Sequence, residues 1–249
     1  PINALLTVAL LWFITPMIDV EAATETVTFE DETGAIQEFE VARRGYHREI
    51  VSFFWVNETG NEELDWLSYG LPIMLAHDLN RVSPVITANT PIDSPLLMRR
   101  LRDQGYDRFL GVPGGLAVEL TRERQSDALV VGSFSEEGAS KTVSIHVIDA
   151  ASGETLETFS TTADSWMAGV DAVTAAVLGA WEITPAENHS DDPVSDHFSN
   201  SLDAVRHFVQ GEIAIDIDGD YPLGMAEYDA ALVIDPAFAE ARSEHSVRQ

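Results

Sequence analysis

His77 and Asp78 are adjacent in the sequence, and a histidine–aspartate pair is one part of metal-dependent phosphohydrolase sites. Such sites add further His and Asp ligands, because imidazole and carboxylate groups suit divalent metals. The pair lies in a segment of helical periodicity, residues 64–81, and no second helix supplies ligands in an obvious pattern. We therefore expect both side chains on an exposed helix face, with metal binding as the alternative.

Four carboxylates have the spacing of a calcium-binding loop. Oxygen ligands at the first, third, fifth and twelfth positions of such a loop can surround a hard cation, and the sixth position requires glycine. Here Tyr221 occupies the sixth position, so the pattern is incomplete. Calcium binding stays open for these residues, which are Asp216, Asp218, Asp220 and Glu227.

Histidine and aspartate also gather in a polar segment that contains Pro185 and Pro193. Imidazole and carboxylate are adequate zinc ligands in composition. A proline-containing polar segment gives no preorganised geometry, however, so we interpret it as a solvated linker. The residues concerned are His189, Asp191, Asp192, Asp196 and His197.

Two further patterns are weaker candidates for chemistry. Gly111, Gly114 and Gly115 precede a predicted helix and could hold an anion at its N-terminus, but no nucleotide fingerprint accompanies them. Ser133 and Ser135 lie on a predicted strand, and no Gly-x-Ser-x-Gly motif occurs. We therefore assign no catalytic, cofactor-binding or metal-binding residue and no cofactor. This chain is expected not to be an enzyme, while the full-length gene product stays open.

The charge of the chain argues against nucleic acid as a partner. Fourteen Lys and Arg residues against 42 Asp and Glu residues give a formal net charge of -28. Such a charge repels phosphate backbones and anionic lipid headgroups. The chain has no cysteine, which removes disulfides, thiolate nucleophiles and cysteine-rich zinc sites.

The first twenty residues differ in kind from the rest. Residues 4–18 carry no charge and are almost entirely apolar, although a bilayer span needs about 20 residues. The chain opens at Pro1, so we interpret 1–20 as a membrane anchor whose cytoplasmic flank is missing. A removed signal peptide, with Val20-Glu21-Ala22 as its cleavage pattern, and a buried core helix are the alternatives. The acidic flank that follows, without Lys or Arg before Arg43, favours an extracytoplasmic location.

The middle of the chain has the pattern of an α/β domain preceded by a β-hairpin. Alternating residues predict hairpin strands over 26–29 and 36–41, and an apolar run predicts a central strand over 49–56. Pro72 predicts a kink or break in the helix over 64–81. Further helices are predicted over 96–104, up to 125 and over 166–181, and further strands over 85–87, 128–134, 142–148 and 155–161, the last three as an antiparallel meander. The aromatics Phe53, Phe54, Trp55 and Trp66 are expected in the core.

Residues 201–236 resemble a tetratricopeptide repeat. The residues that match the repeat are Gly211, the turn Gly219-Asp220-Tyr221, the helix positions Tyr228, Ala231 and Leu232, and Asp235-Pro236, which end the second helix. The first turn has one residue more than the usual pattern, and Gly224 replaces the usual Ala. Residues 237–242 look like the start of another repeat, and one repeat cannot bury its own apolar face. We therefore expect partner binding and a longer array in the natural protein.

The stretch 50–151 resembles the TolB-N-like domains of bacterial membrane sensors. The matching segments are 51–54 (VSFF), 57–60 (NETG), 63–71 (ELDWLSYGL), 126–134 (SDALVVGSF) and 147–154 (VIDAASGE). The resemblance implies an α/β domain on the outer side of a membrane helix, followed by tetratricopeptide repeats. It implies no catalytic residue in this chain. The hairpin before it is an addition to the family pattern.

Together these features predict an α/β (α+β) chain with five parts. They are an anchor (1–20), a β-hairpin extension (21–45), a mixed-sheet TolB-N-like domain (46–183), a linker (184–197) and a tetratricopeptide-type α-hairpin with the start of the next repeat (198–249). The predicted function is a non-catalytic, periplasmic sensory or scaffolding segment of a single-pass membrane protein that binds a protein or peptide. The alternative is the regulatory part of a membrane kinase or adenylate cyclase whose catalytic domain lies upstream. Ligand, partner, output domain and oligomeric state do not follow from the sequence.

Overall fold

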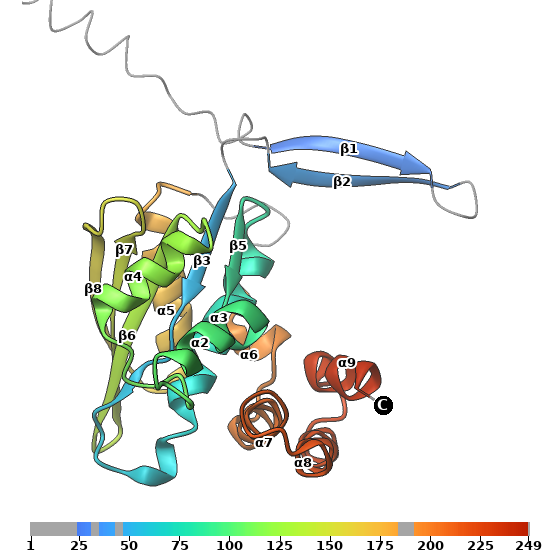
Figure 1. The fold of residues 1–249 in the computed structure, drawn as a ribbon. Helices are drawn as coiled ribbons and strands as arrows, with labels where there is room; N and C mark the ends of the chain where they lie inside the picture. The colour runs from blue at the N-terminus through green and yellow to red at the C-terminus, as the bar shows by residue number, and fades with distance from the viewer. Residues whose placement is uncertain (1–23, 31–34, 43–46, 184–191, 249) are drawn as a thin grey trace, which may run out of the picture. The chain divides into compact units, whose positions relative to one another are not determined.

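The computed structural model describes residues 24–30, 35–42, 47–183 and 192–248, and the chain divides into two compact units at His47 and Arg48. The first unit is a two-stranded antiparallel sheet of β1 (Thr24–Glu30) and β2 (Ile36–Ala42), drawn in blue in Figure 1. Its register runs from Thr24 opposite Ala42 to Glu30 opposite Ile36. The predicted hairpin is therefore confirmed. The anchor predicted over 1–20 lies outside the described residues.

The second unit is built on a mixed sheet with the strand order β5-β3-β6-β7-β8, and β4 pairs with β6. β3 runs parallel to both β5 and β6, and β6, β7 and β8 form the predicted antiparallel meander. The mixed α/β class is confirmed. The strands are β3 (Arg48–Ser52), β4 (Val56–Asn57), β5 (Ile86–Asn89), β6 (Ala128–Glu137), β7 (Ser140–Asp149) and β8 (Thr155–Ala163).

The central strand predicted over 49–56 is interrupted between β3 and β4. Trp55 packs on Gly132 of β6 so closely that a Cβ on this glycine would lie 2.9 Å from the indole ring. The indole thus takes the place of a side chain on β6, while the Phe53 N–H still donates to the carbonyl oxygen of Val130 in β6 at 2.9 Å. The four aromatics expected in the core, Trp55 among them, are all buried.

Helices α2 and α5 pack together on one side of the sheet, and α4 lies on the other (Figure 1). Two short 3-10 turns, η2 and η3, connect strands to helices. The bounds are η2 (Glu62–Leu64), α2 (Leu67–Val82), η3 (Pro91–Asp93), α3 (Pro95–Asp103), α4 (Gly114–Glu123), α5 (Trp166–Gly179) and α6 (Val194–His197).

The sequence predicts a kink or a break at Pro72, and the break is wrong, because helix α2 continues through this residue. A proline removes the hydrogen bond to the carbonyl four residues earlier, here that of Ser68. This carbonyl accepts instead from the backbone N–H of Trp55, at 3.0 Å. The Ser68 carbonyl, which has no helical donor because of Pro72, is therefore hydrogen-bonded by the loop between β3 and β4.

A helical hairpin follows, with α7 (Leu202–Glu212), a π-helical turn η5 (Ile213–Ile217), α8 (Tyr221–Ile234) and α9 (Ala239–Val247). π turns are rare and occur mostly as single turns within α-helices. Gly224 of α8 lies against η5, because a Cβ at this position would overlap Cγ1 of Ile215. The glycine therefore makes room for η5.

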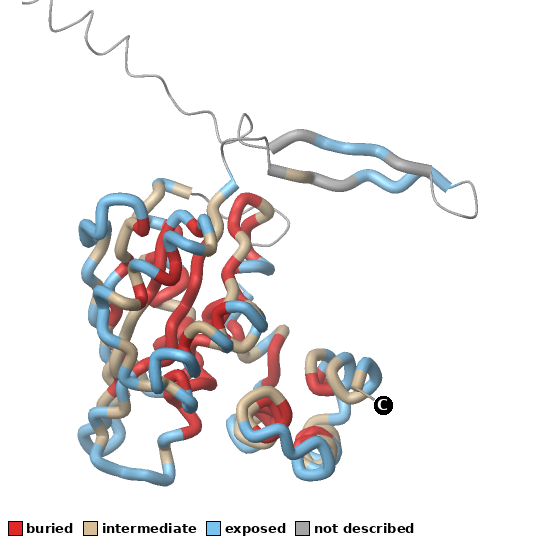
Figure 2. Tube along the Cα trace, in the orientation of Figure 1, coloured by how far each residue is buried: buried red, intermediate tan, exposed pale blue. Residues whose placement is uncertain are grey.

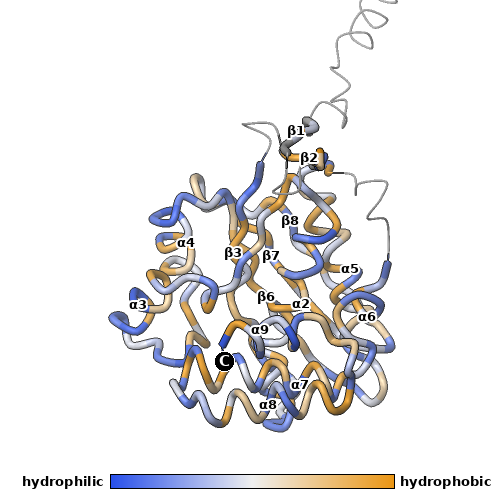
Figure 3. The backbone as a smooth tube through the Cα atoms, turned by 90° about the vertical axis from the view of Figure 1, so that its right-hand side faces the viewer, coloured by the Kyte–Doolittle hydropathy of each residue, from blue (hydrophilic) through white to orange (hydrophobic). Residues whose placement is uncertain are grey.

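The core of the second unit lies between the sheet and its helices and among the helices of the hairpin. Figure 2 shows the buried residues along the inner strands and on the facing sides of α7, α8 and α9. Figure 3 shows apolar residues along the central strands and polar residues on loops and outer turns. Among the described residues, no helix combines the length and the apolar character that a membrane crossing requires.

Candidate binding cleft

Helix α2 joins the α/β domain to the helical hairpin. It packs against α5 and β5 within the domain and against α7 of the hairpin. The ring of His77 meets Phe198 edge-on at 4.9 Å, and Phe198 packs against Phe208 at 5.7 Å and Phe238 at 4.9 Å. This aromatic cluster anchors the hairpin on α2.

A polar clasp fixes the other end of the hairpin. Arg102 donates from Nη2 to the carbonyl oxygen of Asp216 at 3.0 Å, and Arg108 forms an ion pair with Asp218. Tyr69 of α2 donates to the carbonyl oxygen of Arg108 at 3.0 Å. The turn η5 is therefore held against the domain by two arginines that follow β5 in the sequence.

Between these two contacts lies a cleft of about 420 Å³. Its walls come from α2, from the C-terminal end of β5 with η3, and from α7 and α9. Ligands of α/β sheets commonly bind beyond the carboxyl ends of parallel strands, and β5 is parallel to β3. The volume is in the range of small-molecule and side-chain pockets.

The lining of the cleft combines apolar and acidic side chains. Ile73, Ala76, Phe198 and Phe208 supply the apolar part, and among the described residues the lining includes four carboxylates and no Lys or Arg. The four carboxylates are Asp93, Glu212, Glu240 and Glu244.

Glu240 of α9 is the least satisfied of these carboxylates. Its Oε1 lies 3.1 Å from Nε2 of His77, but its Oε2 is buried without a hydrogen-bond partner. Burial raises the pKa of Glu240 above its usual range. Burial, with help from His197 and Arg81, lowers the pKa of His77 to about 4. His77 is therefore neutral at neutral pH and does not compensate the charge of Glu240.

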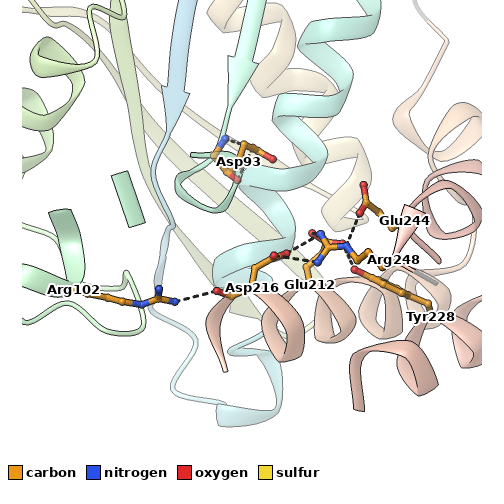
Figure 4. A network of polar contacts seen from close by, with 8 residues as sticks. Asp93, Arg102, Glu212, Asp216, Tyr228, Glu244 and Arg248 are labelled. Atoms are coloured by element: carbon orange, nitrogen blue, oxygen red, sulfur yellow. Dashed lines mark hydrogen bonds and ion pairs between the residues drawn. The ribbon is translucent and has the colours of Figure 1, made fainter. Parts of the chain in front are cut away.

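A guanidinium is already bound beside the cleft (Figure 4). Arg248 donates from both Nη atoms to the carboxylate of Asp216, at 3.0 and 2.9 Å, and from Nε to Glu244 at 2.8 Å. Burial opposes its charge, but these hydrogen bonds and the nearby Glu212 leave its pKa raised. Burial raises the pKa of Glu212 to about 8, and Tyr228 donates a hydrogen bond to it. The carboxylates of Asp216 and Glu244 thus bind the guanidinium of Arg248 beside the cleft.

The other member of the sequence pair, Asp78, lies in a different environment. It is 3% exposed and accepts hydrogen bonds from Oγ1 of Thr174 at 2.5 Å and Nε2 of His197 at 3.0 Å. The expected exposed face is therefore wrong for Asp78, because α5 and α6 cover it. The expected solvated linker is wrong for His197, whose side chain is 5% exposed at the end of α6.

This buried trio does not have the geometry of a catalytic triad. In a triad the base lies between the nucleophile and the carboxylate. Here Asp78 lies between Thr174 and His197, so no base contacts the hydroxyl. The trio joins α2, α5 and α6 and is a structural contact.

The four carboxylates of the calcium pattern have four different partners. Asp216 binds Arg248, Asp218 binds Arg108, and Asp220 accepts from the N–H of Leu223 as the N-cap of α8. Glu227 lies 2.6 Å from Nδ1 of His207. The structure therefore does not bring them together around one point. Within the described residues, no cluster of three or more His, Asp and Glu side chains could hold a metal ion.

The remaining candidates also lie apart. His189 and Asp191 fall outside the described residues, while Asp192 pairs with Arg81 at 3.4 Å. Gly114 and Gly115 form the start of α4 behind Pro113, without a side-chain cap. Ser133 and Ser135 lie on β6, as expected.

The sequence analysis did not single out the cleft carboxylates. A local signal existed, because Glu240 and Glu244 are four residues apart on one helix and so share a face. Nothing local relates them to Asp93 or His77, which come from another part of the chain. The cleft depends on the docking of the hairpin.

No family model matches this chain, and neither does any curated protein. Among solved structures it is similar to TolB from Acinetobacter baumannii, with 14% identity and a TM-score of 0.37 over 71% of this chain and 32% of that one. It is also similar to the C-terminal domain of LpoB from Salmonella enterica (15% identity, TM-score 0.36, 49% and 87% of the two chains). A third is lipoprotein GNA1162 from Neisseria meningitidis (14% identity, TM-score 0.37, 54% and 96%). The chain spans about a third of the TolB structure, and these TM-scores assign it to no family.

Proposed function

We propose that this chain is a non-catalytic binding module that holds a segment of a protein or peptide in the cleft between the α/β domain and the helical hairpin. The cleft itself carries the proposal. It has a volume of about 420 Å³ and is lined by apolar side chains and four carboxylates. Pockets of this size with apolar lining and a few polar groups are the usual binding sites of small ligands and side chains.

The arrangement of polar groups supports binding rather than catalysis. The most buried histidine–carboxylate contact, between His197 and Asp78, places the carboxylate between the hydroxyl and the imidazole. The histidine of the cleft, His77, contacts a carboxylate and aromatic rings. Both histidines thus have structural neighbours, and neither contacts a nucleophile among the residues that the structure describes.

For the whole protein we propose an extracytoplasmic sensory or scaffolding role beside a bacterial membrane. The support is the apolar stretch 4–18, the acidic flank that follows it and the net charge of -28. Fractionation of cells that express the full gene tests this location. Recovery of the chain in the cytoplasmic fraction would show that it is wrong.

The binding proposal is tested by filling the cleft. Ser243 is an exposed residue of α9 that lines the cleft, and Ser246 is an exposed residue of the same helix outside the lining. Ser243→Trp should fill the cleft without removing a contact of the fold, and Ser246→Trp is the matched control. Peptides selected from a displayed random library on the full chain, held in a mild detergent, are then measured on both variants.

Selected peptides should bind the unmodified chain and Ser246→Trp equally and bind Ser243→Trp at least about tenfold more weakly. Equal binding to both variants, or no selected peptide that depends on Ser243, would overturn the proposal. Thermal unfolding of both variants shows whether each is folded.

A further inference from the structure

We propose that Asn80 regulates the entry of a ligand into the cleft, because its carboxamide occupies the edge of β5 where the backbone of an extended peptide pairs in the bound state. This inference rests on the proposed function, since it names how the same site is closed and how the peptide is held there. It is carried by the position of β5 at the edge of the sheet, by the two hydrogen bonds of Asn80 and by the course of the cleft along this edge.

Strand β5 forms one edge of the sheet. It pairs with β3 on one side, and within the described residues no strand pairs with its other side. In an edge strand, the N–H and C=O groups of alternate residues point away from the sheet and can pair with a further strand. Extended peptides commonly bind at such edges, because the peptide adds one strand to the sheet.

Asn80 of α2 closes this edge at Ala88. Its Oδ1 accepts a hydrogen bond from the Ala88 N–H at 2.7 Å, and its Nδ2 donates to the Ala88 carbonyl oxygen at 2.8 Å. A side-chain amide has the same donor and acceptor as a backbone peptide group. The carboxamide of Asn80 therefore takes the place of one residue of a neighbouring strand.

The next residue on the same side of the chain is closed in a similar way. Thr90 follows Ala88 by two positions, and its N–H donates to Oδ2 of Asp93 at 2.6 Å. Both outward N–H groups thus have side-chain acceptors instead of the carbonyl groups of a strand. A side chain can leave such a position by rotation about its own bonds, without unfolding of a helix or strand.

The cleft runs along this closed edge. Asn80, Ala88 and Thr90 all belong to its lining, and Ser243 of α9 lines it from the hairpin. A peptide that fills the cleft therefore lies beside the edge of β5, where Asn80 competes with the peptide backbone for Ala88.

The carboxamide of Asn80 is free to leave. Among the residues that the structure describes, its hydrogen bonds are the two to Ala88. Asn80 is an exposed residue two positions before the end of α2, so rotation of its side chain moves the amide into water. The exchange then costs the two hydrogen bonds to Ala88, each of which contributes modestly because water replaces it.

The charge of the chain favours a peptide over a second copy of the chain at this edge. Among the described residues, the cleft lining includes four carboxylates and no Lys or Arg, and the whole chain has a formal net charge of -28. Two such chains repel each other. A neutral or basic peptide meets no such repulsion, and pairing through the backbone gives affinity without a particular side chain.

The test uses a neutral probe, a pentapeptide of alternating threonine and valine with blocked ends, and an analogue with methylated backbone nitrogens. Methylation removes the N–H donors of the backbone and keeps the side chains. Each is titrated into the isotopically labelled full chain, held in a mild detergent, and followed by NMR. Binding of the probe should move the side-chain amide signal of Asn80 toward that of an amide in water, and the analogue should not bind.

Two variants locate the effect. Asn80→Ala removes the competitor for Ala88 and should tighten probe binding by about tenfold, because the probe no longer displaces two hydrogen bonds. Asn57→Ala is the matched control, because the Asn57 carboxamide also bonds to the backbone, at Asn61 O (3.0 Å) and Thr59 N (2.9 Å), outside the cleft lining. It should leave probe binding unchanged. Thermal unfolding shows whether each variant is folded, and the Asn80 signal of the unmodified chain tests the proposal without either.

The proposal is overturned if Asn80→Ala binds the probe no more tightly than the unmodified chain, if it does not bind the probe, or if the methylated analogue binds equally well. Self-association of Asn80→Ala in place of probe binding would assign the edge to a second copy and also overturn it. If selected peptides depend on Ser243 but bind Asn80→Ala no more tightly, regulation by Asn80 fails while the proposed function holds. If probe binding responds to Asn80 but no selected peptide depends on Ser243, the reverse applies.

Discussion

His77 and Asp78 are adjacent on α2, yet they face two regions of opposite character. Asp78 lies in a closed contact in which both of its oxygens are engaged, by Thr174 and His197. His77 faces the cleft, where the carboxylate it contacts keeps one oxygen without a partner. The same two residue types thus build a contact whose carboxylate is fully engaged, although Nδ1 of its histidine is buried without a partner, and a contact whose carboxylate keeps one unpartnered oxygen. The first holds α2, α5 and α6 together, and the second lines the cleft where we expect a ligand.

The largest expected effect comes from opening the closed contact. Asp78→Ala leaves the Thr174 hydroxyl and the His197 imidazole without their shared acceptor in a buried site. Removal of one partner from a buried charged contact costs about 3 kcal/mol or more, so the free energy of unfolding should fall by that amount. Urea unfolding of the variant measures it.

The matched control is Glu123→Ala, which removes an exposed carboxylate that lies 2.6 Å from Arg100. Its effect should stay within about 1 kcal/mol. A similar loss in both variants would mean that the contact at Asp78 has no special role in stability.

A smaller effect on the free energy of unfolding is expected from His77, which faces the cleft, and this effect depends on pH. His77 has a folded-state pKa near 4 against 6.5 for the free side chain, so between these values the unfolded chain binds the proton more tightly. The free energy of unfolding therefore rises with pH from about 4 to 6.5 and falls as pH is lowered. The contribution is about 2 kcal/mol after allowance for the partial exposure of the ring.

Unfolding of the unmodified chain and of His77→Gln across this range measures the effect. The difference between the two profiles should grow with pH and level off above 6.5, since contributions of other groups, such as Glu212, are present in both. Parallel profiles would show that His77 titrates normally and that the cleft does not keep it neutral.

The smallest effect is expected at the polar clasp. The ion pair of Arg108 and Asp218 has side chains that are 51% and 43% exposed. Exposed ion pairs contribute about 0.2 to 1 kcal/mol, so Asp218→Ala should change stability by no more than that. A double-mutant cycle with Arg108→Ala measures the coupling. A coupling above about 2 kcal/mol would place the clasp, rather than the aromatic cluster at Phe198, at the centre of hairpin docking.

Much of the fold was predictable because its signals are local. Alternation and turn residues predicted β1, β2 and the meander, and the positions of Gly219 and Pro236 predicted the helical hairpin. The interruption at Trp55 was not predictable, because it depends on Gly132, which meets it only in the folded sheet.

The candidate site was not predictable for the same reason. The partners of Asp78 lie 96 and 119 residues away in the sequence, so nothing near the residue reveals its burial. The pattern that looked most like a ligand set, from Asp216 to Glu227, is divided among Arg248, Arg108, a helix cap and His207. Spacing along the chain identifies possible ligands, but the docking of one element on another decides which ones converge.

The hydrogen bond from the Trp55 amide to the Ser68 carbonyl makes the packing of α2 on the sheet measurable by hydrogen exchange. The Trp55 amide has its acceptor only where Pro72 leaves the Ser68 carbonyl free and α2 is in place on the sheet. One N–H therefore depends on a helix to which it does not belong. The rate at which the Trp55 amide exchanges with deuterium therefore reports movements of α2. This helix carries both Asp78, in the closed contact, and His77, in the cleft.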